Sequence, residues 1–134
     1  MIVLDENIDQ QRVLVPLKSR YKGKIISVRD LRPGTVIKDE AIPAILCQHR
    51  QSTFVTTNVI DFWRRVTPHS RYCIVCVPLP AERQDEIPNL LLKLLRQQAF
   101  RTARQRMGKV IRASQSEILY YEVTRTSLAK VAWA

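Results

Sequence analysis

The sequence predicts an α/β fold, a three-layer α/β/α arrangement with a mainly parallel central sheet followed by a C-terminal β-hairpin. Short runs rich in apolar and β-branched residues alternate with segments whose apolar residues recur at helical spacing, which is typical of parallel α/β sheets. The chain has 134 residues, and 46% of them are hydrophobic, so it is long enough to bury one core. We therefore expect a single domain over 1–134, with 107–134 forming the hairpin and a tail.

Four strands are expected in the first part of the chain, and each has a bounded apolar run. The runs lie at 1–4, 25–28, 52–57 and 72–77. Helices are expected over 10–20, over 41–50 behind the acids Asp39 and Glu40, and as one long amphipathic helix from Glu82 to about Gln105. Lys109–Ala113 and Glu117–Val123 then predict the two strands of the hairpin, while the tail could dock on the domain or on a partner.

Three cysteines and two histidines do not form a ligand pattern. Cys73 and Cys76 have the spacing of a metal or redox pair, but they fall in a predicted strand. Residues three apart in a strand point to opposite faces, so both are expected to be core residues. His49 and His69 have no partner at metal-ligand spacing and are expected at the surface.

The charge is strongly positive and unevenly spread. There are 22 Lys and Arg against 12 Asp and Glu, and Ile87 to Ser116 contains seven cations and no acid. Such a field favours a polyanion, above all nucleic acid, although solubility alone would also account for it. Six basic residues are candidate nucleic-acid contacts: Arg64, Arg65, Lys93, Arg96, Arg101 and Arg104. The absence of a long apolar run and of a signal-like N-terminus leads us to expect no membrane partner and a cytoplasmic location.

Acids recur where the predicted strands end or helices begin. Asp5 and Glu6 follow the first run, Asp39 and Glu40 begin a helix, and Asp61 follows the third run. Chemistry in parallel sheets is located beyond the carboxyl ends of strands, and Mg²⁺ or Mn²⁺ is bound by oxygen ligands. Helix capping explains the same acids equally well.

The order of these motifs resembles the PIN-like superfamily, in particular its small bacterial VapC-like and uncharacterised branch. The residues that carry the resemblance are Leu4-Asp5-Glu6-Asn7, Asp39-Glu40-Ala41-Ile42 and Thr57-Asn58-Val59-Ile60-Asp61-Phe62, within about residues 1–112. The resemblance implies a ribonuclease that uses Mg²⁺ or Mn²⁺, with RNA as substrate, a cognate antitoxin as partner and a homodimer as an option.

The resemblance also implies residue roles. Asp5, Asp39 and Asp61 would be the metal ligands, with Glu40 and Glu6 as further catalytic acids, and Thr57 and Asn58 would brace the site. One position departs from the pattern, because Val59 stands where the family's third motif usually has an acid. The alternative is therefore a catalytically degenerate PIN-like module that binds nucleic acid or a partner. A nucleotide-binding domain ranks last, since the three glycines form no phosphate loop.

Overall fold

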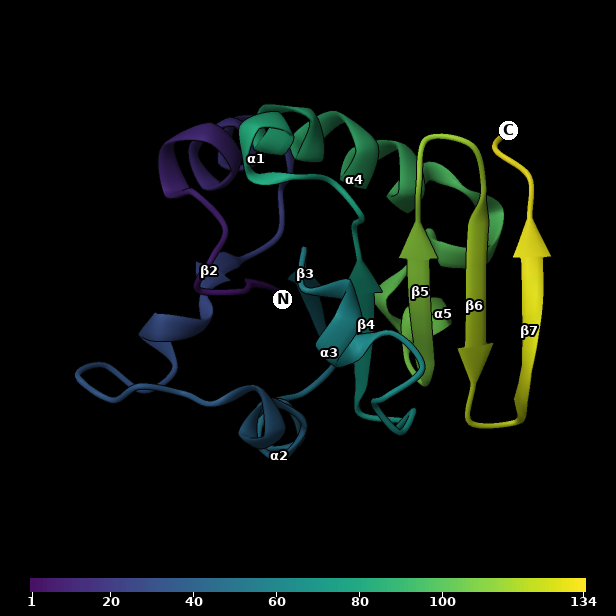
Figure 1. Cartoon of the computed structure of the whole chain (residues 1–134), viewed down its shortest axis with the longest axis horizontal. Helices are drawn as coiled ribbons and strands as arrows, with labels where there is room; N and C mark the ends of the chain where they lie inside the picture. Colours follow the sequence, from purple (N-terminus) through teal and green to yellow (C-terminus); the bar gives the residue numbers. More distant parts are fainter.

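The protein is built on one mixed sheet of seven strands in the order β2-β1-β3-β4-β5-β6-β7 (Figure 1). A computed structural model describes all residues from 1 to 134. The pairs among the first five strands in this order are parallel, and β6 and β7 are added antiparallel. The strands are β1 Ile2–Leu4, β2 Ile25–Ser27, β3 Ser52–Thr56, β4 Tyr72–Cys76, β5 Lys109–Ala113, β6 Ile118–Glu122 and β7 Arg125–Val131. The predicted α/β class is confirmed.

Helical segments connect the parallel strands. The α-helices are α1 Val15–Arg20, α2 Ile42–Cys47, α3 Val59–Phe62, α4 Ile87–Arg96 and α5 Ala103–Arg106. A π-helical turn over Gln10–Leu14 leads into α1, and 3₁₀ turns occur at Val28–Asp30, Asp39–Ala41, Ala81–Glu86 and Gln98–Phe100. None of these helices has the length and apolar character that crossing a bilayer would require.

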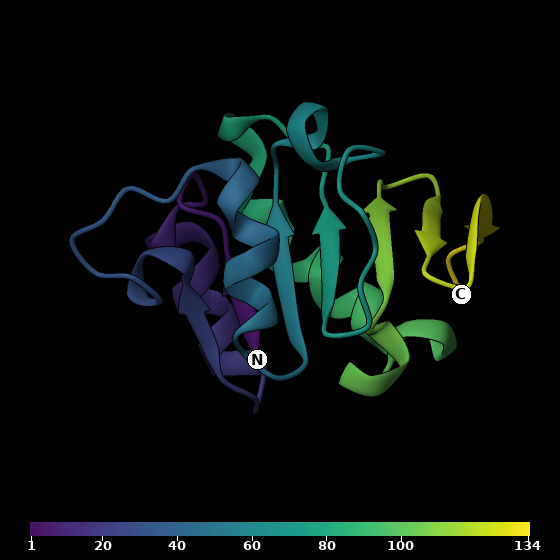
Figure 2. The same ribbon diagram turned by 90° about the horizontal axis from the view of Figure 1, so that it is seen from below.

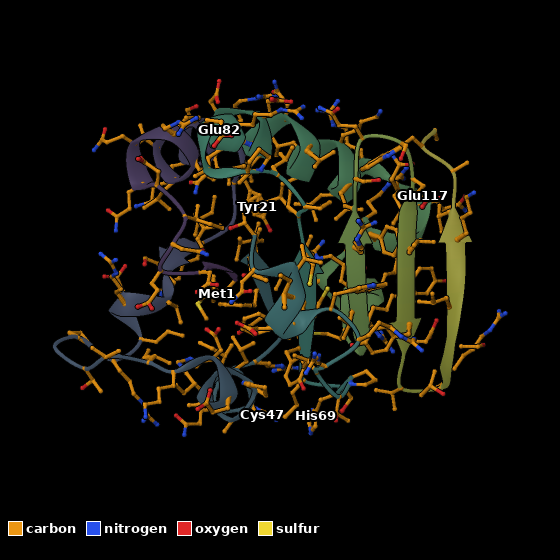
Figure 3. The ribbon with its side chains drawn as sticks, viewed as in Figure 1. Met1, Tyr21, Cys47, His69, Glu82 and Glu117 are labelled. Carbon is orange, nitrogen blue, oxygen red and sulfur yellow. The ribbon has the colours of Figure 1, made fainter.

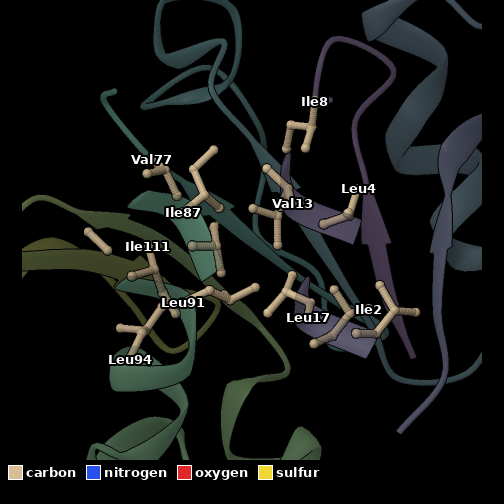
Figure 4. Close-up of a cluster of buried hydrophobic side chains, with 14 of the residues drawn as sticks. Ile2, Leu4, Ile8, Val13, Leu17, Val77, Ile87, Leu91, Leu94 and Ile111 are labelled. Atoms are coloured by element: carbon tan, nitrogen blue, oxygen red, sulfur yellow. The ribbon is translucent and has the colours of Figure 1, made fainter. Parts of the chain in front are cut away.

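Buried side chains form two clusters, one on each face of the sheet. The larger contains Leu4, Leu17 and Leu91, and it lies between the strands and the layer of α1 and α4 (Figures 1 and 4). The other contains Leu46 and Phe54 and lies on the side of α2. In Figure 3, Glu82 lies on the side of α4 and Cys47 on the side of α2.

The strand period of two places the cysteines as predicted. Cys73 belongs to the first cluster and Cys76 to the second, and both are fully buried. Burial raises the pKa of each thiol to about 12, which keeps both in the inert protonated form at neutral pH. The interpretation of these residues as core hydrophobes is confirmed.

The single long helix expected from Glu82 to Gln105 is wrong. The chain leaves α4 at Gln97, whose backbone is extended at φ −66° and ψ 141°, and Thr102 then caps the separate helix α5. Leu91 and Leu94 lie on the apolar side of α4, and a continuous helix would turn Phe100 well away from that side. The break instead buries Phe100 completely, whereas a continuous helix would place it on the same side as exposed cations.

The C-terminal hairpin is confirmed, and the tail adds a further strand. β5 and β6 pair antiparallel as expected, and β7 continues the sheet beyond β6. The Trp133 indole Nε1 donates a hydrogen bond to the Ser114 carbonyl at 2.8 Å. The tail therefore docks on its own domain.

The two ends of the parallel strands carry different structures. α3 follows the carboxyl end of β3, whereas the segment from Gln97 to Arg106 lies at the amino ends (Figure 2). Two hydrogen bonds fix the latter: the Gly108 N–H donates to the Tyr72 carbonyl, and Arg106 Nε donates to Thr53 Oγ1. These two ends are the places where charged groups collect.

Candidate functional site

Asp5 lies at the carboxyl end of β1 and is almost completely buried, with 4% of its surface exposed. The Thr56 hydroxyl donates to Asp5 Oδ2 at 2.6 Å, and the Glu6 N–H donates to Asp5 Oδ1 at 2.8 Å. The pairing of Leu4 with Val55 explains this contact, because the next residues, Asp5 and Thr56, lie opposite each other and on the same face. A carboxylate is thereby fixed at the end of the sheet.

Asn58 connects the other two acids. Its Nδ2 donates to Asp39 Oδ2 at 2.9 Å and to Asp61 Oδ2 at 2.7 Å. Its side-chain oxygen caps α3 by accepting from the Asp61 N–H, and its own N–H donates to Thr56 Oγ1 at 2.9 Å. Thr56 and Asn58 thus link Asp5, Asp39 and Asp61 into one polar cluster, which we call the acidic cluster.

Burial and neighbouring charge raise the pKa of two carboxyl groups in the acidic cluster. Burial is the largest cause of the raised pKa of Asp5, and the hydrogen bonds from Thr56 and Glu6 only partly oppose it. The pKa of Asp39 is also raised, by desolvation first and then by the charges of Asp5 and Asp61 and by a hydrogen bond with Asp61. The Asp39 shift indicates that negative charge from Asp5 and Asp61 reaches this carboxyl group, whereas the Asp5 shift reflects its burial.

No basic side chain neutralises the acidic cluster. The ion pairs of the protein are Arg12 with Asp85, Arg83 with Glu86, and Lys130 with Glu117, all elsewhere. A chain with nearly twice as many cations as acids has therefore left its most crowded carboxylates unpaired. Their oxygen donors suit Mg²⁺ or Mn²⁺. As the side chains stand, no three carboxylate, histidine or cysteine groups form a complete metal site.

The other predicted acids lie near the acidic cluster. Glu40 lines a cavity of about 480 Å³ together with Asp39, Asp61 and Arg65. Glu6 is exposed, and its carbonyl accepts a hydrogen bond from Arg29 at 3.3 Å. Neither carboxylate makes a hydrogen bond within the chain, so both are free to approach a bound ligand.

The bracing contact predicted for Thr57 is made by Thr56. Side chains alternate between the two faces of the sheet along β3, so Phe54 and Thr56 both lie on the α2 face. Thr57, one residue later, does not lie on that face. The side chain of Thr57 makes no hydrogen bond to the acids, whereas the contacts of Asn58 agree with its predicted place. The β-strand period, counted from the buried Phe54, was the signal that could have identified Thr56.

Val59 occupies the position where the resembled family usually has an acid. It is half-buried and packs against the apolar cluster on the α2 face. Its N–H donates to the Thr57 carbonyl at 2.9 Å, so the backbone turns directly into α3. Only the Asp61 end of this motif therefore contributes an acid.

The predicted nucleic-acid contacts fall into two groups. Arg65 lines the cavity beside the acidic cluster, and Arg64 lies next to it in the chain. Arg64 has a left-handed backbone at φ 62°, donates to the Thr126 carbonyl at 3.1 Å and lies 5.0 Å from the ring centre of Tyr121. Arg64 therefore holds the β7 strand, and Arg65 is the free cation of the pair.

The remaining four predicted contacts do not lie beside the acids. Arg96, Arg101 and Arg104 belong to the end of α4 and the segment that follows it, which lies at the amino ends of the strands, and Lys93 Nζ lies 4.7 Å from the ring centre of Trp133. The six candidate contacts therefore do not form one continuous basic surface beside the acidic cluster. Arg106, which carries no motif in the sequence, is buried at this end.

Comparison with known proteins returned no match, whether by family models, by curated protein sequences or by solved structures.

Proposed function

We propose that the protein is a metal-dependent ribonuclease of PIN-like type, with the three-layer arrangement of that superfamily and the acidic cluster as its metal site. The observation that carries the proposal is that Asp5, Asp39 and Asp61, linked through Thr56 and Asn58, have no basic partner in a chain of net charge +10, and that Asp5 and Asp61 repel charge on Asp39. A bound divalent cation would relieve this repulsion. Mg²⁺ is commonly held by one or two carboxylates with water in its other positions, so an incomplete protein shell is compatible with it.

Each residue of the acidic cluster has a distinct task in this proposal. The half-buried Asp39 and the exposed Asp61 are the carboxylates that bind the ion, and the buried Asp5 contributes fixed negative charge. Thr56 holds Asp5 in place, and Asn58 sets the separation between Asp39 and Asp61. When bound, the ion supplies Lewis-acid stabilisation of the phosphate and a water of lowered pKa.

The surrounding groups favour a phosphodiester substrate. Arg65 shares the cavity with Asp39 and Asp61, and an arginine beside a metal site can bind the phosphate oxygens of a nucleic-acid backbone. Glu40, in the same cavity, is placed to accept a proton from an attacking water. The choice of RNA, and a toxin role beside a cognate antitoxin, rest on the resemblance alone.

Cleavage of an RNA oligonucleotide with Mg²⁺ or Mn²⁺ tests the proposal. Asp5→Asn and Asp61→Asn are expected to lower the rate by at least about 100-fold, while Glu82→Gln, an exposed acid far along the chain, leaves it unchanged. Folding of each variant is checked from its Tm. Equal cleavage by the wild type and both aspartate variants would reject the acidic cluster as the active site.

Val59 favours a second candidate, a degenerate module that binds nucleic acid or a partner without cleaving it. In that case RNA binding would fall steeply with salt and would need no metal. Isothermal titration with Mn²⁺ separates the two candidates, because the ribonuclease requires a specific site that Asp5→Asn weakens. The degenerate module requires that no such site appear.

A further inference from the structure

A cavity of about 510 Å³ at the amino ends of the strands is lined by four arginines and by no acid. Arg20 comes from the end of α1, Arg96 from the end of α4, and Arg101 and Arg106 from the segments that follow. Tyr21 and two leucines of α4 form its apolar wall. We call this cavity the arginine pocket.

Arg106 is the buried member of the arginine pocket, with 3% of its surface exposed. Its Nε donates to Thr53 Oγ1 at 3.1 Å, and its Nη1 donates to the carbonyls of Phe100 at 3.0 Å and Arg101 at 3.3 Å. Its Nη2 group makes no hydrogen bond within the chain. The guanidinium is therefore held rigidly from one side, and its remaining donors are free for a ligand in the pocket.

Arg106 also lacks a counter-charge. It takes part in no ion pair, and its three acceptors are all uncharged. A buried charge is costly unless it is paired, so a buried guanidinium with neutral partners calls for an anion from outside the chain. The acidic cluster cannot serve, because it lies at the other end of the strands.

The exposed members of the arginine pocket are open to the same anion. Arg96 and Arg101 make no side-chain hydrogen bond or ion pair, and Arg20 donates to Asn89 at 2.5 Å. The Tyr21 ring packs so closely against Gly23 that a Cβ at this position would lie 2.7 Å from it. Gly23 thus permits close approach of this ring, and it does not adopt the left-handed backbone found at Gly34 and Gly108.

We propose that the arginine pocket is a binding site for a phosphate group, with Arg106 as its buried anchor and Arg96 and Arg101 as its exposed clamps. Guanidinium groups bind phosphate oxygens through paired donors, which makes arginine the preferred residue for this anion. The apolar wall with Tyr21 gives room for a nucleoside attached to the phosphate. The pocket is separate from the acidic cluster and does not depend on its function.

Thermal unfolding with added phosphate tests this site directly. Inorganic phosphate is compared with chloride at equal ionic strength, because a protein of charge +10 binds anions non-specifically. A ligand that binds only the folded state raises Tm, and the phosphate series gives its affinity. Arg96→Gln and Arg101→Gln are expected to weaken that affinity by roughly tenfold each.

The matched control is Arg104→Gln, which removes the same charge from an exposed position of α5 outside the arginine pocket. It is expected to leave the phosphate affinity unchanged, and so is Asp5→Asn in the acidic cluster. Equal phosphate responses in the wild type, Arg96→Gln and Arg101→Gln would overturn the proposal. So would a phosphate response no larger than that of chloride. Arg106→Lys keeps the positive charge but lacks the paired N–H donors of the guanidinium, so a folded variant is expected to bind phosphate more weakly.

Two further probes identify the source of the phosphate. Adenosine 5′-monophosphate offers a terminal phosphate, and a short RNA without a 5′-phosphate offers only phosphodiesters. Binding of the first that depends on Arg101 assigns the pocket to a phosphomonoester, and Arg101-dependent binding of the second assigns it to an RNA strand. Binding of both probes with no dependence on Arg96 or Arg101 would contradict the site.

Discussion

Thr56 is the residue on which the arrangement of the acidic cluster depends most. Its hydroxyl donates to Asp5 and accepts from the Asn58 N–H, and the side chain is fully buried. One hydroxyl therefore satisfies two groups that water cannot readily reach. The neighbouring Thr57 has no such contact.

Thr56→Val, which keeps the side-chain shape, is expected to lower the free energy of unfolding by about 1–3 kcal/mol, because it leaves a buried carboxylate oxygen and a backbone N–H without a partner. Thr57→Val is the matched control, with an expected change within about 0.5 kcal/mol. Urea unfolding at pH 7 measures both. Equal costs at the two positions would show that the hydroxyl of Thr56 does not hold the cluster.

Asp39 makes the stability depend on pH in a defined direction. Its pKa is raised in the folded state by desolvation and by the charges of Asp5 and Asp61, so its ionised form is less favourable in the folded than in the unfolded chain. This destabilising effect is fully present above the folded pKa, and it is lost as the pH falls through that value towards 3.8.

Asp39→Asn is therefore expected to be more stable than the wild type at pH 7, and the difference should shrink as the pH is lowered towards 4. Urea midpoints at pH 7, 5 and 4 measure the trend, and Glu82→Gln controls for the loss of one charge. A difference in stability between Asp39→Asn and the wild type that grows as the pH is lowered would contradict the raised pKa of Asp39. At pH 7, Mg²⁺ should reduce the difference in stability between Asp39→Asn and the wild type, because an ion bound to the acidic cluster stabilises the wild type.

At the scale of elements, the strands were the part of the fold that the sequence predicted best. Ile2–Leu4, Ser52–Thr56 and Tyr72–Cys76 are apolar runs between turn residues, and burial on both faces leaves such runs few alternatives. The acids at 5, 39 and 61 could be predicted to approach one another because parallel strand ends share an edge. The choice between Thr56 and Thr57 depended on which face of the sheet Phe54 occupies, because the alternation along β3 is counted from that residue.

The helices after β4 were predicted poorly because their boundaries depend on contacts with the rest of the fold. Glu82–Gln105 reads as one amphipathic run, yet the burial of Phe100 and the capping of α5 by Thr102 divide it. The chain after α4 then runs to the amino ends of the strands, so the predicted contacts Lys93, Arg96, Arg101 and Arg104 lie away from the acids. Arg106 was missed because only tertiary packing shows that this arginine is buried.

Phe100→Ala is expected to cost about 3–5 kcal/mol, since it empties a fully buried position where the segment after α4 meets the sheet. The Phe100 ring packs edge-on against Tyr120 at 5.5 Å between centres, so the change also loosens β6. Leu128→Ala, at a side chain that is 45% exposed on β7, is the control and should cost much less. A loss below about 1 kcal/mol for Phe100→Ala would show that this segment is not anchored as described.

At the scale of the whole molecule, opposite charges lie at opposite ends of one sheet. Asp5, Asp39 and Asp61 lie beyond the carboxyl ends, and Arg96, Arg101 and Arg106 lie near the amino ends. A five-residue strand such as β3 is about 16 Å long, so the two groups are too far apart for direct contact. The net charge of +10 is therefore not a uniform field, and a polyanion would meet a basic end and an acidic end.

This separation predicts that the two sites are energetically independent. The changes in the free energy of unfolding caused by Asp39→Asn and Arg101→Gln should add in the double variant to within about 0.5 kcal/mol. Likewise, Arg101→Gln should not change the rise in Tm that Mg²⁺ produces. Asp39→Asn should not change the rise in Tm that phosphate produces. Urea unfolding of the wild type, both single variants and the double variant measures the cycle. A coupling above about 1 kcal/mol would mean that the sheet transmits a change from one end to the other, and the two ends would then have to be treated as one site.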